Sequence, residues 1–436
     1  MWNRLTTLWQ RLAGSLWFIP LLIVIGAVAL AVALIEAQQF VDREALAGFP
    51  RIFGADAEST RSMLAAIAGS MITVAGVTFS ITVVAVSQAS SQYTPRILRN
   101  FMRDRTSQVV LGVFVGIFVY CLVVVRTIRA DEAVRFIPSL AALGAYLLAI
   151  AGIGFLVYFI HHIAGTLEAG TILARIGQET TEAVERLFPH MNGRDSPPGQ
   201  SSLPERWYPI AASATGYIQR IDGDGLLRAA ADRDTVLRME HGVGDFVYAG
   251  MPLLSAAAPE AVEDRLDRYF VVDSYRTVHQ DAEFGIRQMV DIALKALSPG
   301  INDSTTAVTC VDHIGAVLVR LAGRRVEAPN RYEAGRLRLI ACGPTFESLA
   351  GVAFDEIRRN AGTNVSVLSR MLRVIGLVGT EISDPDRRAV LRRHAQRLLR
   401  TAEQNMPMEE DLAEVRQHFE WVIGRLASQH PAAPRV

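Results

Sequence analysis

One hydrophobic segment carries small and hydroxylated residues at helical spacing, which makes it the first candidate for a functional surface. The residues recur at steps of seven, four, three, four and seven, so they lie along one face of a helix. They are Ser62, Gly69, Thr73, Gly76, Ser80 and Ser87. Such a face could line a hydrated path formed by copies of the helix around an oligomer axis. It could also serve close helix–helix packing in lipid, and the sequence leaves both interpretations open.

A second group of polar residues lies around two expected helix ends in the C-terminal half. Arginines and free helix-end amides could hold an anion there, whereas the acids would favour a cation. Asn302 and Asp303 are also natural N-cap residues, so part of the group has a purely local explanation. The candidates for binding an ion or small ligand are Arg276, Thr277, His279, Gln280, Asp281, Arg287, Asn302, Asp303, Thr305 and Thr306.

The sequence shows no recognised enzyme or cofactor motif. It has no GxxxxGK[ST], GxSxG or HExxH, and no GxGxxG that leads into a helix. No catalytic residue is therefore assigned, and neither a cofactor nor a metal is expected. His161 and His162 point about 100° apart on a helix, so we interpret them, with Glu168, as lipid-headgroup contacts. Wide spacing argues against a disulfide framework or a zinc site for the three cysteines, Cys121, Cys310 and Cys342.

The composition is that of a membrane protein, with 50% hydrophobic and 20% charged residues. Four uncharged apolar runs are long enough to cross a hydrocarbon core of about 30 Å as helices. They occupy residues 17–35, 63–86, 109–125 and 137–160. Because no ionisable residue lies inside a run, a proton relay or ion-coupled pump has no evident carrier. The lipid bilayer is the expected partner, and passive permeation remains possible.

The arginines beside short loops indicate the orientation. The segment between the second and third runs carries Arg96, Arg99, Arg103 and Arg105 against one acid, whereas the preceding connection has three arginines and five acids. The positive-inside rule therefore predicts that both termini are cytoplasmic, although the short loop with Arg126, Arg129 and Arg135 is discordant. Headgroup anchoring explains the four arginines, and an anion-selecting vestibule is the alternative. The 44 basic and 44 acidic residues cancel, so no nucleic-acid partner is expected.

The predicted fold is an α-helical membrane protein of four transmembrane helices with an α+β cytoplasmic region. The four-helix domain covers residues 1–162, and the last span continues without a break into a helical stalk at 163–190. A Pro- and Ser-containing linker follows at 191–206. A small β module is predicted at 207–258 and a mainly helical domain at 259–436.

The β module is predicted from short alternating segments. They lie at residues 216–221, 226–230, 235–240, 245–247 and 250–254, with a tight turn at 222–225. The glycine pattern from Gly242 to Leu254 resembles the barrel-sandwich hybrid fold of lipoyl and biotinyl domains. Those domains carry their cofactor on a hairpin lysine, and here the only lysine is Lys295, in an expected helix. A swinging-arm carrier role is therefore excluded.

Helical periodicity and breakers predict the C-terminal elements. Helices are expected at 261–269, 281–297, 304–321, 345–360, 365–381, 386–405 and 408–428. The last four are expected to serve packing or assembly.

Several motifs together resemble one family. They are Gly76-Val77-Thr78-Phe79-Ser80, Ser91-Gln92-Tyr93-Thr94-Pro95-Arg96, Gln280-Asp281-Ala282-Glu283-Phe284-Gly285 and Ala296-Leu297-Ser298-Pro299-Gly300-Ile301-Asn302-Asp303. The chain is similar, over nearly its whole length, to the bacterial predicted membrane proteins grouped as the domain of unknown function DUF2254. Ser304-Thr305 departs from the Pro-Phe of relatives within a helix's first turn. The resemblance implies a multi-pass inner-membrane protein and implies no reaction, substrate or cofactor.

Three functional hypotheses follow. The first is a homo-oligomeric channel or passive transporter whose second span lines the pathway and whose cytoplasmic region regulates it. The second is a non-enzymatic membrane sensor or scaffold that binds a ligand or partner through its cytoplasmic domain. The third is a membrane-bound enzyme that uses the region of Gln280-Asp281 and Asn302-Asp303.

Overall fold

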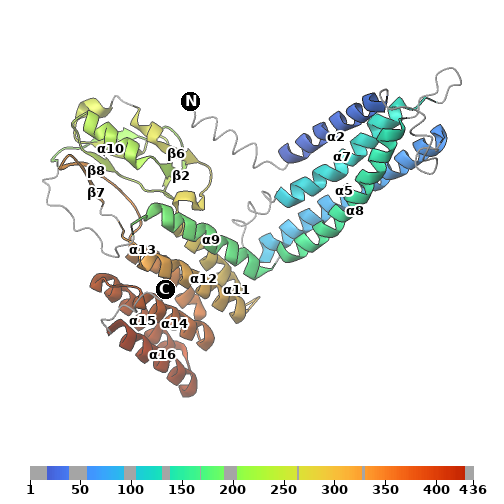
Figure 1. Ribbon diagram of the computed structural model, residues 1–436. Coiled ribbons are helices and arrows are strands. Elements are labelled where there is room, and N and C mark those ends of the chain that lie inside the picture. The colour runs from blue at the N-terminus through green and yellow to red at the C-terminus, as the bar shows by residue number, and fades with distance from the viewer. Residues whose placement is uncertain are drawn as a thin grey trace. The chain divides into compact units, whose positions relative to one another are not determined.

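The chain forms two compact units, one ending at Glu168 and one beginning at Ala169 (Figure 1). The computed structural model describes residues 17–38, 56–92, 105–129, 138–166, 168–190, 204–262, 265–326 and 329–427. The predicted basic segment around Arg96, Arg99 and Arg103 and most of the predicted linker at 191–206 lie outside these residues.

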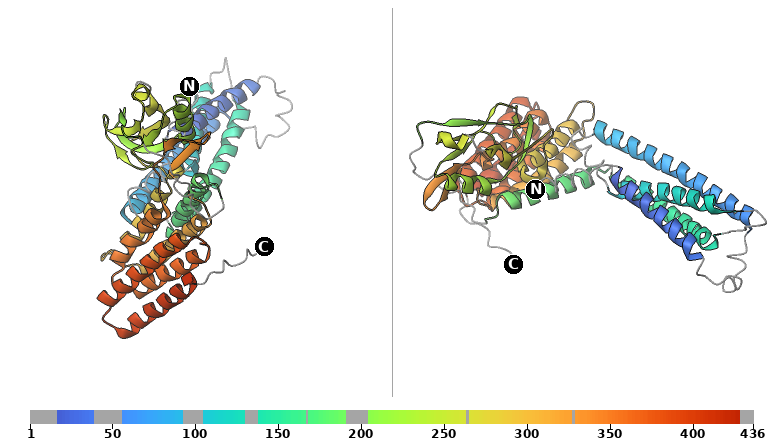
Figure 2. Two further views of the ribbon diagram at one scale, coloured as in Figure 1. Left: turned by 90° about the vertical axis from the view of Figure 1, so that its left-hand side faces the viewer. Right: turned by 90° about the horizontal axis from the view of Figure 1, so that it is seen from above.

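Among its described residues the first unit has four long helices, and each coincides with most or all of one predicted apolar run. They are α2 (Phe18–Ala37), α5 (Ala57–Gln92), α7 (Arg105–Thr127) and α8 (Ser139–Thr166). They lie side by side in both views of Figure 2. Among the described residues, one further helix is long and apolar enough to cross a membrane, namely α12 (Ser304–Ala322) in the second unit.

Helix α7 is the centre of the first unit, because it packs against each of the other three helices. Phe114, Tyr120 and Val124 of α7 are fully buried. Gly112 lets α2 approach so closely that a Cβ would meet the backbone of Pro20. The Tyr120 hydroxyl donates to the carbonyl of Ala141, at 2.8 Å, which satisfies the polar tip of this buried ring.

The contacts define an up–down order of the four helices. Gly112 and Gly116 face successive turns of α2, so α2 and α7 run in parallel. Arg61 near the start of α5 donates to the carbonyl of Ile128 just beyond the end of α7, at 3.5 Å, so α5 runs antiparallel to α7. The start of α2, the end of α5, the start of α7 and the end of α8 therefore share one end of the bundle.

The helical stalk is interrupted, and the prediction of one unbroken helix was wrong. Helix α8 ends at Thr166 and the amphipathic helix α9 (Ala169–Leu187) begins three residues later. Gly165 and Gly170 flank the break, and glycine is the least favourable non-proline residue in a helix interior. Both glycines lie within the adjoining helix ends, so they weaken the helix on either side of the break.

The second unit contains two sheets. The strands are β1 (Tyr208–Ala211), β2 (Gly216–Ile221), β3 (Leu237–Met239), β4 (Phe246–Val247), β5 (Pro252–Ala256), β6 (Phe270–Asp273), β7 (Asn330–Glu333) and β8 (Arg336–Ile340). Five form a sheet in the order β1-β5-β3-β8-β7, and three form a sheet in the order β4-β2-β6. Since β6, β7 and β8 come from beyond residue 258, the β region extends past its predicted boundary. A barrel-sandwich fold is not confirmed.

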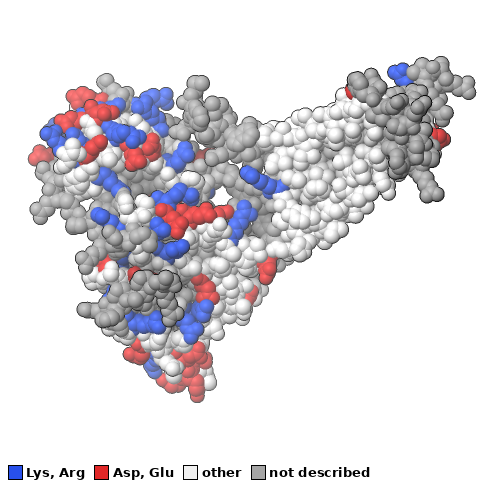
Figure 3. Space-filling view, viewed as in Figure 1, with Lys and Arg blue, Asp and Glu red and all other residues white. Residues whose placement is uncertain are grey.

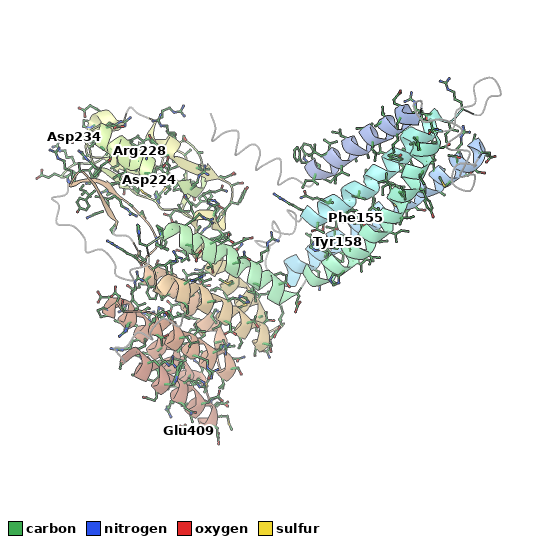
Figure 4. The ribbon with its side chains drawn as sticks, in the orientation of Figure 1. Phe155, Tyr158, Asp224, Arg228, Asp234 and Glu409 are labelled. Carbon is green, nitrogen blue, oxygen red and sulfur yellow. The ribbon has the colours of Figure 1, made fainter. Side chains whose placement is uncertain are left out.

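The segment predicted as a turn and a strand at 222–230 is a helix, α10 (Gly223–Asp232). Asp222 caps it, accepting from the amide of Gly225 at 2.8 Å. Leu226, Ala229 and Ala230 are buried, and their i, i+3, i+4 spacing is that of a helix face. Helical periodicity therefore prevailed over the turn composition of Asp-Gly-Asp-Gly. Asp224 and Arg228 of α10 are labelled in Figure 4.

The rest of the second unit is helical. Two 3-10 turns, η2 (Pro259–Val262) and η3 (Leu266–Tyr269), stand where one helix was predicted at 261–269, and η4 (Val278–Gln280) follows. The other predicted helices are confirmed as α11 (Ala282–Ala296), α12, α13 (Phe346–Ala361), α14 (Val365–Thr380), α15 (Pro385–Asn405) and α16 (Glu409–Ala427). Side-chain caps begin α11, α12, α13, α14 and α15.

The Asp222 cap offers a direct test of α10. Asp222→Ala is expected to destabilise this helix by about 1 kcal/mol, because the amide of Gly225 loses its acceptor. Hydrogen exchange of peptides covering 223–232 should then accelerate by about fivefold. Asp232→Ala, at the other end of the helix, leaves the cap intact and serves as the control. Equal exchange in the two variants would show that the cap is not what holds the helix start.

Candidate functional site

The six small residues predicted to form one face of the second span are all exposed on α5. We call Ser62, Gly69, Thr73, Gly76, Ser80 and Ser87 the α5 stripe. A Cβ added at Gly69 or at Gly76 would meet no other atom within 4 Å. Thr73 satisfies its hydroxyl within the helix by donating to the carbonyl of Gly69, at 2.8 Å. The stripe is therefore exposed and polar.

The opposite face of α5 makes the contacts with the rest of the unit. Leu64, Ala68, Met71 and Ala75 are buried, and they belong to one core with α7 and α8. Thr78 is buried on the same face. The sequence predicted that the stripe lies on one face of the helix. In the structure, the opposite face is the one packed in the interior of the unit.

The α5 stripe is bordered by apolar rather than charged side chains. Val77 is 52% exposed, Phe79 54% and Ile81 39%. Between Ser62 and Gln92 the helix contains no Asp, Glu, Lys or Arg. Figure 3 shows the same character on the visible face of the four helices, which is free of charge between its ends. The exposed face of α5 thus combines a narrow polar stripe with apolar flanks.

The polar residues singled out in the second unit do not form one group. Asp281 caps the start of α11 and Asp303 caps the start of α12, which follows the end of α11. A helix of 15 residues is about 22 Å long, so the two caps lie at opposite ends of α11. Arg276, Thr277, His279 and Gln280 belong to the first end, and Asn302, Thr305 and Thr306 belong to the second. Arg287 lies within α11.

At the first end, Arg276 and Asp281 form a bidentate ion pair. Arg276 Nε donates to Asp281 Oδ2 at 2.8 Å, and its Nη2 donates to Oδ1 at 3.0 Å. Asp281 is 5% exposed and also accepts from the amide of Phe284. Burial alone would lower the pKa of Arg276, but its bonds to Asp281 outweigh this and raise the pKa above its ordinary value. The charged groups of both residues are thus used in this internal ion pair.

Two more candidates also have internal partners. The side-chain carbonyl oxygen of Gln280 accepts from the amide of Ile221, at 3.0 Å, and so joins η4 to β2. Arg287 pairs with Glu356 of α13 at 2.6 Å.

At the second end, the cap interpretation is confirmed for Asp303. Its carboxylate accepts from the amide and the hydroxyl of Thr306, at 3.0 and 2.5 Å, and these bonds lower the pKa of Asp303. Asn302 is not the cap. It adopts a left-handed conformation with φ of 51° and, like Thr305, is exposed.

The structure brings two arginines to His279 that the sequence did not single out. Arg186, in the last turn of α9, donates from Nε to the backbone carbonyl of His279 at 3.3 Å. Burial, followed by the charges of Arg186 and of Arg220 on β2, lowers the pKa of His279. We call Arg186, Arg220 and His279 the basic cluster. The three residues are 34 and 59 positions apart in sequence, so no local motif indicated it.

The histidines at the end of α8 show no metal-site geometry. The His162 ring stacks on Tyr158, labelled in Figure 4, with ring centroids 6.1 Å apart. Within the described part of the chain, no three His, Cys, Asp or Glu residues come together in a way that could hold a metal ion.

The ion pair of Arg276 and Asp281 distinguishes a structural from a ligand-binding role. Arg276→Met is expected to cost about 3 kcal/mol of stability, because the buried Asp281 carboxylate loses its counter-charge. Arg287→Met, whose partner Glu356 is more exposed, should cost less than about 1 kcal/mol. Thermal unfolding of the full chain in detergent compares the two. Similar losses of stability in the two variants would contradict a structural role of the Arg276 ion pair.

Comparison with known proteins gives the family. The profile of DUF2254, described as "Predicted membrane protein", matches residues 13–376. Uncharacterised proteins of Mycobacterium bovis and of two strains of Mycobacterium tuberculosis are each 33% identical over 434 residues, covering 95% of this chain and 81% of theirs. No solved structure gives a significant match. The open, uncharged faces of the four long helices suit a membrane environment, and the chain belongs to the DUF2254 family of predicted membrane proteins.

Proposed function

We propose that this protein is an oligomeric inner-membrane channel or passive transporter in which copies of α5 line the pathway. The observation that carries the proposal is the exposure of the α5 stripe on a helix whose opposite face is packed against α7 and α8. Hydroxyls and backbone at glycines can face water, whereas the flanking apolar side chains can face neighbouring helices or lipid. An assembly of copies would give the stripe a hydrated surrounding that acyl chains do not provide.

The proposed topology has four membrane spans, namely α2, α5, α7 and α8. The fifth apolar helix, α12, contains Asp312, which pairs with Arg370 of α14, and it also contacts α9, α11 and α13. These contacts support its place in a soluble helical domain. The bundle end shared by the start of α2 and the end of α8 is then cytoplasmic, in agreement with the arginine distribution.

Passive permeation is favoured over active coupling. The described parts of α2, α5, α7 and α8 carry Asp, Glu, Lys and Arg only near helix ends. Since pumps and coupled transporters use ionisable groups within the membrane, an uncharged polar stripe fits conduction along a gradient. The second unit would then regulate this passage.

A non-enzymatic membrane sensor is the second candidate function. It is supported by the basic cluster, because Arg186 of α9 and Arg220 of β2 both act on His279 of η4 in the second unit. This role requires ligand binding and no flux.

Thiol cross-linking tests whether α5 stripes of different copies face each other. In a Cys342→Ser background, which removes the exposed cysteine, Ser80→Cys should be linked between copies by a short bifunctional thiol reagent. Ile81→Cys is the control, since it is also exposed on α5 but lies about 100° around the helix. We expect covalent dimers in membranes for Ser80→Cys at several times the yield of the control. Dimers from Ile81→Cys alone would place another face at the contact.

Flux through purified protein in liposomes tests conduction itself. Ser80→Phe is expected to reduce ion flux about tenfold or more, because a bulky apolar ring on the stripe narrows and dries the pathway. Ile81→Phe, on the apolar flank, should leave most of the flux. Size-exclusion chromatography of both variants reports assembly. Unchanged flux through Ser80→Phe would refute the proposal that the stripe lines a pore. Loss of the oligomer in Ser80→Phe would show instead that the stripe packs against neighbouring helices.

A further inference from the structure

We propose that the basic cluster binds a phosphate group, carried by a small soluble molecule or a lipid headgroup. The cluster is built from the last turn of α9, from β2 and from η4, all within the second unit. This site is separate from the α5 stripe. Its existence does not depend on conduction by the membrane unit.

Hydrogen bonds fix the three elements against one another. Arg186 Nε donates to the carbonyl of His279, at 3.3 Å, and the amide of Ile221 donates to Gln280 at 3.0 Å. Gln219 adds a bond from its Nε2 to the carbonyl of Tyr275, at 2.7 Å. These bonds fix the positions of the three elements that carry the side chains of the cluster.

An irregularity in β2 contributes to the placement of Arg220. Its pairing with β6 shifts register between Ile218 and Arg220, so Gln219 is an extra residue relative to the partner strand. Such a bulge changes the side of the sheet to which the following side chains point, and bulges frequently lie beside binding sites. Arg220 follows this irregularity directly and precedes Ile221, whose amide bonds to Gln280, the neighbour of His279.

The cluster differs from neighbouring arginines in lacking a counter-charge. Arg276 pairs with Asp281, and Arg324 pairs with Glu185 at 3.0 Å. By contrast, no ion pair among the described residues joins Arg186, Arg220 or His279 to an acid, and both charged neighbours that act on His279 are cations.

The acids near the cluster in sequence have other partners, and Asp222, two residues after Arg220, caps α10. Glu182, one turn before Arg186, accepts from Gln178 at 3.1 Å. Glu185 faces Arg320 and Arg324, and Asp281 faces Arg276. The like charges of the cluster repel each other, and a bound anion would remove that repulsion.

Phosphate is the anion that matches this donor set. A guanidinium donates in a fixed fork that fits phosphate oxygens, and two such groups with an imidazole can satisfy three oxygens from three directions. A phosphate or phosphomonoester with nearly two negative charges balances two arginines, whereas one carboxylate would leave a net positive site. The C-terminal partial charge of α9 opposes an anion, and Arg186 in its last turn offsets that effect.

Phosphate binding would connect α9 to the sheet containing β2. The two elements contribute one arginine each, so a single bound group contacts both. A ligand that engages both arginines would stabilise the end of α9, the helix that follows the membrane unit in the chain.

The test measures inorganic phosphate binding to the full chain in nanodiscs made only of phosphatidylcholine. We expect saturable binding by isothermal titration and a rise in the unfolding temperature on phosphate addition. Arg186→Gln combined with Arg220→Gln should weaken binding about tenfold or more and abolish the rise. Arg392→Gln combined with Arg400→Gln, two exposed arginines of α15, is the charge-matched control and should bind as the wild type does.

The outcomes separate the proposal from its alternatives. Equal binding by the double variant and the wild type would overturn the site, as would the absence of binding to both inorganic phosphate and phosphatidic acid. Binding only in nanodiscs containing phosphatidic acid, and lost in the double variant, would assign the phosphate to a lipid headgroup. Unfolding of the double variant without phosphate checks that it is folded, and His279→Gln, which removes one donor, gives an independent loss of affinity. None of these readouts depends on ion flux.

Discussion

Lipid offers no hydrogen bonds, so a helix inside it must satisfy its polar groups by itself or against another helix. In α5 this constraint divides the surface in two. Leu64, Ala68 and Met71 fill the contact with α7 and α8, while the α5 stripe remains outside that contact. A Cβ at Gly69 or Gly76 of the stripe would meet no described atom of another helix within 4 Å. The environment of the stripe is therefore the property on which the proposed function depends.

In the second unit, several charged side chains that lie between elements are paired with an opposite charge. Arg276 is matched by Asp281, Arg287 by Glu356 and Arg370 by Asp312. Asp222, Asp281 and Asp303 cap helices and so satisfy amides that the helix starts leave open. The basic cluster differs from these pairs, because among the described residues no ion pair joins its three members to an acid, and two arginines act on the same histidine.

Sequence patterns predicted the long elements well because their signals are local. Apolar runs of about 20 residues and the cap at Asp303 depend only on neighbours in the chain. The strands β7 and β8 were missed because they are short, and β8 pairs in parallel with β3 from about 100 residues earlier. The predicted ligand group combined residues from both ends of α11, since spacing in sequence does not reveal which end of a helix a residue shares with another element.

The separation of charge on α9 explains how the basic cluster stays unneutralised beside an acid. Glu185 and Arg186 are consecutive, and consecutive helical side chains point about 100° apart. Glu185 is therefore directed to Arg320 and Arg324 of the α12 region, whereas Arg186 reaches His279. Arg324 also donates to the carbonyl of Phe188 at 2.8 Å, which fixes the end of α9 and with it the direction of both side chains. The geometry of the helix thus keeps Glu185 away from the cluster, and the position of Arg186 beside His279 is a consequence of how α9 packs.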